Sequence, residues 1–241
     1  MMPPVALNTA LFLDIDGTLL DLARTPETVF VPQDLVAALI LLNARLRGAF
    51  AFVSGRSLAS IDALFQPFRP AAIGAHGGEI RGADGTVFQA GPISPAVRDI
   101  FIGLVENIPG LLLEDKGCAL ALHYRLAPEA LPVVQSAMET HRKLLQAERI
   151  DILQGKAVIE ARHKGIDKGT AVASLYKQRP FAGRELVFGG DDTTDEDVFR
   201  ILPRLGGRGF SVGRQFTGAE YLFDSPRAVR QWLVNAAGAV A

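Results

Sequence analysis

The sequence predicts an α/β protein in which a parallel-sheet core is interrupted by an inserted α+β domain. Short apolar runs typical of buried strands alternate with stretches of helical period in residues 1–93, and again in 164–241. Between them, residues 94–163 change to one helix followed by two strands, a pattern that occurs twice. Because alternating strands and helices indicate a parallel sheet covered on both faces, the two outer stretches are predicted to form one core and 94–163 a second domain.

Composition excludes several classes of protein. The 241 residues are 49% hydrophobic and 21% charged, and 25 basic against 26 acidic side chains leave a net charge of −1. That balance gives no basis for binding nucleic acid or an anionic membrane through bulk positive charge. The single cysteine, Cys118, excludes an internal disulfide and a cysteine-rich zinc site. Since no apolar run could span a bilayer and the first residues lack a signal-peptide pattern, we expect a cytoplasmic protein.

The first part of the core begins with a strand. Residues 10–15, ALFLDI, are apolar except for Asp14, and the turn residues Asp16-Gly17-Thr18 follow. Leucines at helical spacing then predict a helix over 34–47. The other elements of this part are strands at 49–53 and 71–75 and a helix over about 57–66.

The inserted domain is predicted as αββαββ. Helices are expected over 95–108 and 128–147, and strands over 111–117, 118–125, 150–156 and 157–164. Such a block can pack two helices on one four-stranded antiparallel sheet.

The second part of the core returns to alternation. Its predicted elements are a helix at 168–178, a strand at 185–190, a polar turn at 191–195, a helix through about 202, a strand near 210–212 and a last helix from Pro226, with Ser225 as its cap.

Aspartates gather after two of the predicted strands. Asp14 and Asp16 belong to the first, and Asp191, Asp192 and Asp195 follow the strand at 185–190. Ligands of open parallel sheets bind outside the carboxyl ends of the strands, so neighbouring strands would bring these carboxylates together. Carboxylates held close repel one another unless a cation joins them, and hard oxygen ligands suit Mg²⁺. For Asp195 the favoured interpretation is capping of the following helix.

Two further positions suit an anionic ligand. Ser54 ends the strand at 49–53, where its hydroxyl could donate to a phosphoryl oxygen, although Ser54-Gly55-Arg56 taken alone is an ordinary turn. Lys168 opens a predicted helix, where a cation is unfavourable unless an anionic partner faces it.

Together these motifs resemble the haloacid dehalogenase superfamily of phosphoryl-transfer enzymes. The first motif stands as Asp14-Ile15-Asp16-Gly17-Thr18-Leu19, the second as Ser54, the third as Lys168 and the fourth as Gly190-Asp191-Asp192. The resemblance implies a Rossmann-like parallel-sheet core (haloacid dehalogenase-like) with an inserted α+β cap domain. It also implies Mg²⁺ as cofactor and an aspartyl-phosphate intermediate.

The resemblance also implies a role for each motif residue. Asp14 would be the nucleophile and Asp16 the general acid, then base. Mg²⁺ would be held by the Asp14 carboxylate, the Asp16 backbone carbonyl and Asp191, while Asp192 would order the metal shell or Lys168. Ser54 and Lys168 would stabilise charge on the transferring oxygens.

Other segments are similar to trehalose-6-phosphate phosphatases. They are the acidic run Asp191–Asp197, Ser54-Gly55-Arg56-Ser57, Gly74–Glu79 and the αββαββ cap. The implied activity is hydrolysis of trehalose 6-phosphate to trehalose and phosphate, the last step of trehalose biosynthesis. The implied substrate-binding residues are Arg56, Glu114, Lys116, His123, Arg125, Lys156 and Glu160.

Less specific interpretations stay open for several of these residues. From spacing alone, Glu114 and Arg125 would form an exposed cross-strand ion pair, and His123 would simply pack. His76, in a glycine-rich turn, is favoured as structural. Gly78 stands where family members often carry alanine, a small departure.

Competing functions can be weighed on the same residues. The nearest alternative is another capped sugar-phosphate phosphatase, of the sucrose phosphate or mannosylphosphoglycerate type. A phospho-receiver would be shorter and without a cap, and an inactive regulator should have lost Asp14 or Asp16. We expect a monomer that binds no nucleic acid and no membrane. Hinges near Gly91-Pro92 and Gly165 would let the cap close over substrate.

Overall fold

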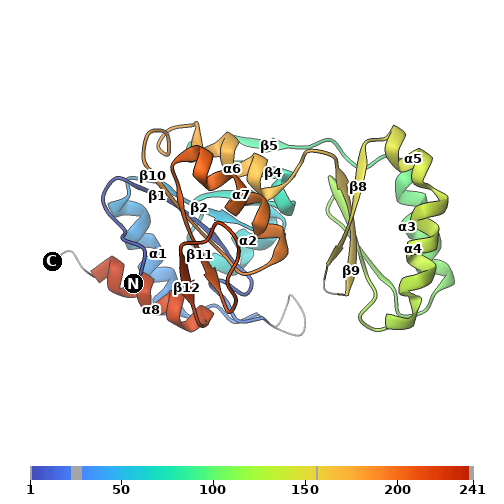
Figure 1. Ribbon diagram of the computed structural model, residues 1–241, viewed down its shortest axis with the longest axis horizontal. Coiled ribbons are helices and arrows are strands. Elements are labelled where there is room, and N and C mark those ends of the chain that lie inside the picture. Colours follow the sequence, from blue (N-terminus) through green and yellow to red (C-terminus); the bar gives the residue numbers. More distant parts are fainter. Residues whose placement is uncertain (1, 23–28, 156, 239–241) are drawn as a thin grey trace. The chain divides into compact units, whose positions relative to one another are not determined.

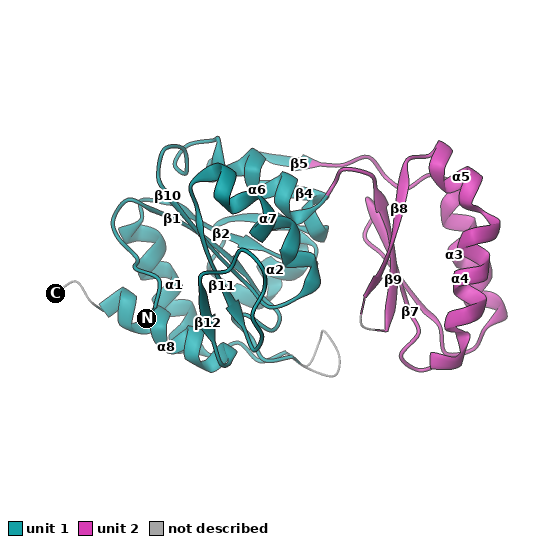
Figure 2. Ribbon diagram, in the orientation of Figure 1, with its two compact units in different colours: residues 1–88, 167–241 teal, residues 89–166 magenta. Residues whose placement is uncertain are grey.

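The computed structural model describes residues 2–22, 29–155 and 157–238, and the chain forms two compact units (Figures 1 and 2). Unit 1 comprises Met1–Phe88 and Asp167–Ala241, and unit 2 comprises Gln89–Ile166. The ends of unit 2 lie a few residues outside the range 94–163 that the sequence pattern marks.

Unit 1 is built, within the described residues, on an eight-stranded sheet of order β12-β11-β10-β1-β2-β3-β4-β5. Its strands are β1 (Thr9–Asp14), β2 (Phe50–Val53), β3 (Ala71–Gly74), β4 (Glu79–Arg81), β5 (Val87–Gln89), β10 (Glu185–Gly190), β11 (Arg208–Val212) and β12 (Tyr221–Phe223). The pairs from β12 to β3 are parallel, and β4 pairs with β3 in the antiparallel sense. The predicted parallel-sheet core is therefore confirmed.

The described residues of unit 1 form five α-helices, four of which pack together in two pairs. They are α1 (Gln33–Arg45), α2 (Leu58–Phe65), α6 (Lys168–Tyr176), α7 (Glu196–Leu205) and α8 (Pro226–Gly238). Helix α1 packs against α8, and α6 packs against α7. Every residue of β1 and β2 is buried, which is why these strands, apart from Thr9 and Asp14 of β1, are apolar rather than alternating. Aromatic rings fill the layers, for example Phe12 against Phe181 and Phe188 against Phe199.

Unit 2 has a four-stranded antiparallel sheet of order β6-β7-β9-β8 among its described residues. The strands are β6 (Leu112–Asp115), β7 (Ala119–His123), β8 (Ile150–Gly155) and β9 (Val158–His163), and the helices are α3 (Pro95–Asn107), α4 (Leu131–Thr140) and α5 (Arg142–Ala147). Figure 2 shows the helices on one face of this sheet. The arrangement matches the predicted αββαββ block with one exception.

That exception is the helix predicted as continuous over 128–147. It begins as a separate 3₁₀ turn at Pro128–Ala130 and breaks at His141, between α4 and α5. Thr140 donates its hydroxyl to the Ser136 carbonyl at 2.8 Å, and such bonds to the preceding turn bend helices. Because a single threonine is tolerated inside a helix at a cost of only tenths of a kcal/mol, on the order of 0.5, the sequence pattern alone did not predict the break.

The face of the unit 2 sheet that points away from the helices is polar. Strand alternation places Leu120, Leu122 and Ile159 in the apolar core of this unit. Glu160 and His123 point to the other face of the sheet. We call this the open face of unit 2, although the Glu160 side chain is itself buried.

Candidate active site

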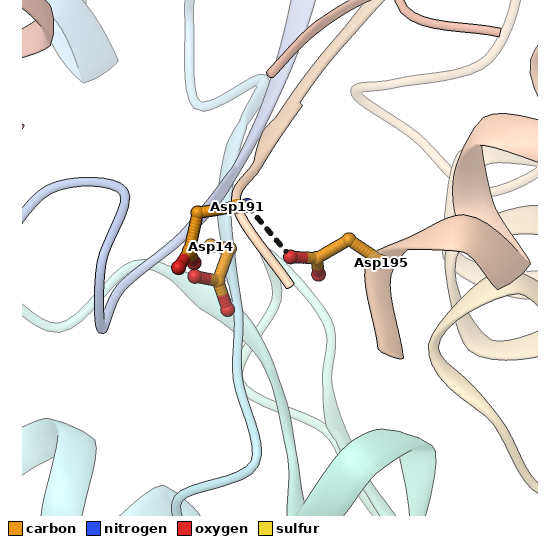
Figure 3. A group of neighbouring side chains, drawn as sticks. All are labelled: Asp14, Asp191 and Asp195. Atoms are coloured by element: carbon orange, nitrogen blue, oxygen red, sulfur yellow. Dashed lines mark hydrogen bonds between the residues drawn. The ribbon is translucent and has the colours of Figure 1, made fainter. Parts of the chain in front are cut away.

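The first strand, β1, and β10, far apart in the sequence, lie side by side. β1 pairs with β10 in parallel register, Leu13 opposite Gly189, so Asp14 and Asp191 reach the same carboxyl edge of the sheet. Figure 3 shows their carboxylates close together, with Asp195 across from them. The expected convergence of distant acids is thus present in the structure.

Three of these acids form a group that could hold a metal ion. Among the described residues, Asp14, Asp191 and Asp195 each offer an oxygen within 4.8 Å of the others. Asp14 and Asp195 are buried and Asp191 is half-buried. Asp192, which we predicted as a metal ligand, is exposed and lies outside this group, because it precedes the 3₁₀ turn η4 (Thr193–Asp195) with its side chain at the surface.

Asp195 is the site residue that the sequence reasoning assigned differently. It stands at the N-cap position of α7, but its side chain makes no capping hydrogen bond to that helix. Instead, one carboxylate oxygen accepts hydrogen bonds from the backbone N–H of Asp191 at 2.9 Å and of Asp192 at 3.0 Å. The other oxygen accepts from Lys168 Nζ at 2.7 Å. Asp195 is 0% exposed and therefore orders the loop after β10 and the lysine together. No pattern in the sequence separates this role from capping, since it depends on the contact with Lys168.

Lys168 lies where the sequence placed it, at the first position of α6. The preceding residue, Asp167, caps that helix through a reciprocal pair of hydrogen bonds with Thr170. The Lys168 ammonium is buried and donates to Asp14 Oδ1 and to Asp195 Oδ1, each at 2.7 Å. The anionic partners expected for a cation at a helix N-terminus are these two carboxylates.

The turn after β1 brings a hydroxyl to the same carboxylates. Thr18 Oγ1 lies 3.0 Å from Asp14 Oδ2 and 3.2 Å from Asp191 Oδ1, so its one proton can serve either acceptor. Gly17 makes the approach possible: its φ is +84°, and a Cβ at this position would lie 2.1 Å from Asp191 Oδ2. Thr18 belongs to the first motif, yet the sequence reasoning gave it no role.

Burial and mutual repulsion shape the electrostatics of the group. Burial raises the pKa of Asp14 well above its usual value, the Asp195 and Asp191 carboxylates raise it further, and Lys168 opposes them. Burial, and next the Asp195 carboxylate, raise the pKa of Asp191 to about 6. Burial alone would lower the pKa of Lys168, but Asp14 and Asp195 outweigh it and raise the pKa. The three carboxylates, when ionised, therefore carry more negative charge than the one ammonium group of Lys168 neutralises.

Asp16 and Arg56 form an ion pair beside this group. Arg56 Nε donates to Asp16 Oδ2 at 2.6 Å, and Nη2 donates to Oδ1 at 2.7 Å, a two-point contact typical of arginine and carboxylate. Ser54 is buried, and its hydroxyl oxygen accepts from the Arg56 backbone N–H at 3.1 Å. Because β2 neighbours β1, Ser54 lies at the same edge of the sheet as Asp14.

On the open face of unit 2, four of the predicted substrate-binding residues are linked. Lys116 Nζ lies 3.2 Å from Glu160 Oε1 and 3.9 Å from Glu114 Oε2. His123 Nε2 lies 3.1 Å from the same Glu114 oxygen. Ala121 of β7 stands opposite both glutamates, which explains their common face.

Two predicted substrate residues are not in this cluster. Arg125 is exposed and follows the last paired residue of β7, so Glu114 pairs with His123 and not with Arg125 as spacing suggested. The prediction for Lys156 lies outside the described residues.

The fold and the site together define a class of protein. A parallel sheet with acids at the adjoining ends of β1 and β10, a buried lysine at the start of α6 and an inserted antiparallel unit is the architecture of haloacid dehalogenase-like phosphatases with a cap. None of the described helices has both the length and the apolar character that a membrane span requires.

Comparison with known proteins assigns the family. The profile of the trehalose-phosphatase family matches residues 12–218. A probable trehalose-phosphate phosphatase of Sinorhizobium fredii is 43% identical over 92% of this chain and 84% of its own length. Trehalose-6-phosphate phosphatase of Escherichia coli is 36% identical over 96% of this chain and 87% of its own. The chain belongs to the trehalose-phosphatase family.

Solved structures agree at the level of the fold. The C-terminal domain of C. albicans trehalose-6-phosphate phosphatase superposes with a TM-score of 0.80 at 24% identity, and covers 96% of this chain and 92% of its own. A trehalose-6-phosphate phosphatase related protein gives a TM-score of 0.75 at 25% identity, covering 95% and 97%.

Proposed function

We propose that this protein hydrolyses trehalose 6-phosphate to trehalose and inorganic phosphate, with Asp14 as the nucleophile. The observation that carries the proposal is the buried group of Asp14, Asp191, Asp195 and Lys168 at the adjoining ends of β1 and β10. The substrate comes from the relatives, which are named for this activity and match nearly the whole chain.

The carboxylate group fits a magnesium ion. Its donors are hard oxygens, and burial, and next the negative charge of Asp195, raise the pKa of Asp191; a bound cation would offset that negative charge. Asp14 and Asp191 would hold the ion, with Asp195 behind them. When bound, Mg²⁺ would neutralise the negative charge of the phosphate that approaches Asp14.

Asp14 would attack phosphorus. Its oxygen forms a bond to phosphorus while the bond between phosphorus and the sugar oxygen breaks, which leaves an aspartyl phosphate on Asp14. Lys168 holds the attacking carboxylate in place at 2.7 Å and favours its ionised form against the effect of burial, and its ammonium balances charge on the phosphoryl oxygens. Ser54, at the same edge, would donate its hydroxyl to one of these oxygens.

Asp16 would transfer the protons in both steps of the reaction. As a general acid it protonates the departing sugar oxygen, and as a general base it then takes a proton from the water that attacks the aspartyl phosphate. Arg56 engages both oxygens of Asp16 in the structure, so it would have to release one of them before that oxygen can carry a proton to the sugar oxygen or take one from water. Arg56 would then turn to the phosphate.

Unit 2 would supply recognition of the sugar. Glu114, Lys116, His123 and Glu160 hold both donors and acceptors on its open face, and vicinal hydroxyl groups need both; the Lys116 and Glu160 side chains are each 9% exposed, beside the more exposed Glu114 and His123. We propose unit 1 as the catalytic core and unit 2 as the cap for sugar recognition, with Mg²⁺ at the core site.

Phosphate release from trehalose 6-phosphate tests the proposal directly. The wild type should release phosphate with Mg²⁺ and lose activity in EDTA, and Asp14→Asn should be inactive yet folded. A panel with sucrose phosphate and mannosylphosphoglycerate separates the alternative substrates. Faster turnover of either one would overturn the assignment to trehalose 6-phosphate, and full activity of Asp14→Asn would overturn the mechanism.

A further inference from the structure

One turn of unit 1 contacts both segments that we assign to phosphate binding. Gly74–Glu79 joins β3 to β4 and contains the 3₁₀ turn η2 (Ala75–Gly77). Its three central residues, Ala75, His76 and Gly77, have φ angles of 47°, 52° and 105°. Non-glycine residues adopt this left-handed backbone at an energetic cost, and they keep it where surrounding contacts enforce it, often beside functional sites.

The first set of contacts is to the segment Ser54–Arg56. The backbone N–H of His76 donates to the Ser54 carbonyl at 3.1 Å, and that of Ala75 donates to the Arg56 carbonyl at 2.8 Å. The imidazole of His76 lies against Gly55, where a Cβ would come within 2.2 Å of His76 Nε2. The backbone bonds and the ring therefore fix this segment from one side.

The second set of contacts is to the start of α6. A Cβ on Gly77 would lie 2.5 Å from the Asp167 carbonyl oxygen and 3.2 Å from Ala171 Cβ, so the turn is in close contact with the first turn of this helix. Asp167 caps α6 and directly precedes Lys168. The same short turn thus lies against both the serine segment and the lysine segment.

We propose that the turn Gly74–Glu79 is a positioning element, which sets the distance between the Ser54–Arg56 segment and Lys168 so that both reach one phosphoryl group. The inference rests on the proposed function. His76 acts through Gly55 and needs no contact with substrate. Rates of positioned reactions fall about 100-fold for a misplacement of about 1 Å, so a clash inside this contact should be measurable.

A double-mutant cycle tests the contact between the ring and the glycine. The φ of Gly55 lies outside the left-handed region, so an alanine there meets the His76 ring but no backbone strain. Gly55→Ala should lower kcat/KM about 100-fold and weaken inhibition by inorganic phosphate. Gly55→Ala/His76→Ala, in which the ring no longer opposes the methyl group, should recover at least about tenfold of that loss.

The control is Gly103→Ala. Gly103 lies in α3 of unit 2, and its φ is also outside the left-handed region. A Cβ there would meet nothing within 4 Å, so the same glycine-to-alanine change is made in the other unit and without a clash. Its kinetics should equal those of the wild type. If Gly55→Ala does not fold, His76→Ala serves instead, and it should raise the inhibition constant for phosphate at least about fivefold.

The results separate this inference from the proposed function. Equal losses on trehalose 6-phosphate and on p-nitrophenyl phosphate support positioning of the phosphate, because the second substrate has no sugar. Wild-type kinetics in Gly55→Ala, or a double variant no better than Gly55→Ala, would overturn the inference. A wild type that binds phosphate with Mg²⁺ but hydrolyses no sugar phosphate would overturn the proposed function, and calorimetry of phosphate binding would then test the turn by the same cycle.

Discussion

Replacing Asp195 by asparagine should damage both the stability of unit 1 and the activity. In the structure, one oxygen of this fully buried carboxylate accepts from two backbone N–H groups and the other from Lys168. An asparagine carbonyl can replace only one of these oxygens. If it faces the backbone, its NH₂ group points at the lysine ammonium, and if it faces the lysine, both backbone donors lose their partner.

The size of the effect follows from these contacts. Breaking a buried ion pair costs about 3–5 kcal/mol. Lys168 keeps its bond to Asp14, and the loss of one negative charge relieves Asp14 and Asp191, so we expect the free energy of unfolding to fall by about 2–3 kcal/mol. Because the lysine is no longer held from both sides, kcat/KM should fall by about two orders of magnitude, as for other lost charge-stabilising groups.

Urea denaturation in EDTA, followed by the fluorescence of Trp232, measures the loss of stability. Trp232 is the only tryptophan of the sequence and lies in the core of unit 1, so it reports on that unit. Asp192→Asn is the matched control, since Asp192 is exposed, and it should change stability by less than about 0.5 kcal/mol. A variant at Asp195 that matches this control in stability and in kcat/KM would refute the role given to the carboxylate.

The site permits three further predictions. Because the native pKa of Asp191 is raised from 3.8 to about 6, the native state binds the extra proton between these values. The free energy of unfolding of the metal-free wild type should therefore fall by on the order of 2–3 kcal/mol relative to that of Asp191→Asn as the pH rises from 4 to 7, and Mg²⁺ should restore this stability at pH 7. If urea denaturation gives the two proteins the same pH dependence of stability, the prediction is wrong. Thr18→Val removes a hydrogen bond that lowers the pKa of Asp191, so less of this carboxylate is ionised at pH 6 and calorimetry should show a weaker affinity for Mg²⁺. An unchanged affinity would contradict the role of Asp191 as a magnesium ligand supported by Thr18. Glu160→Gln should raise KM for trehalose 6-phosphate about tenfold and leave p-nitrophenyl phosphate hydrolysis unchanged, whereas equal effects on both substrates would place Glu160 outside sugar recognition.

Sequence patterns predict the elements of this fold best where burial is complete. β1, β2 and β10 are continuous apolar runs, and their ends locate Asp14, Ser54 and Asp191. The strands β4, β5 and β12 were not predicted, because each has three residues and is partly or wholly exposed, so no apolar run or alternation marks it.

The roles of individual acids are harder to predict. Asp16 and Arg56 are 40 positions apart, and only the turn after β2 brings the arginine back to the first motif. The position of Asp195, directly before α7, is compatible with capping that helix and with pairing with a buried lysine. Only the packing of α6 against η4 decides between these two roles. Arg125 was assigned to the wrong cross-strand pair because register depends on where the hairpin begins, which alternation does not fix.

The position of a bound cation tests the central claim most directly. Crystals of the wild type grown with Mn²⁺ in place of Mg²⁺ would reveal the ion by its anomalous signal. The arrangement of the acids predicts a peak between the carboxylates of Asp14 and Asp191, with Asp195 still bonded to Lys168. A cation found elsewhere, with Asp14 and Asp191 still in their hydrogen bonds to Lys168 and Thr18, would contradict it.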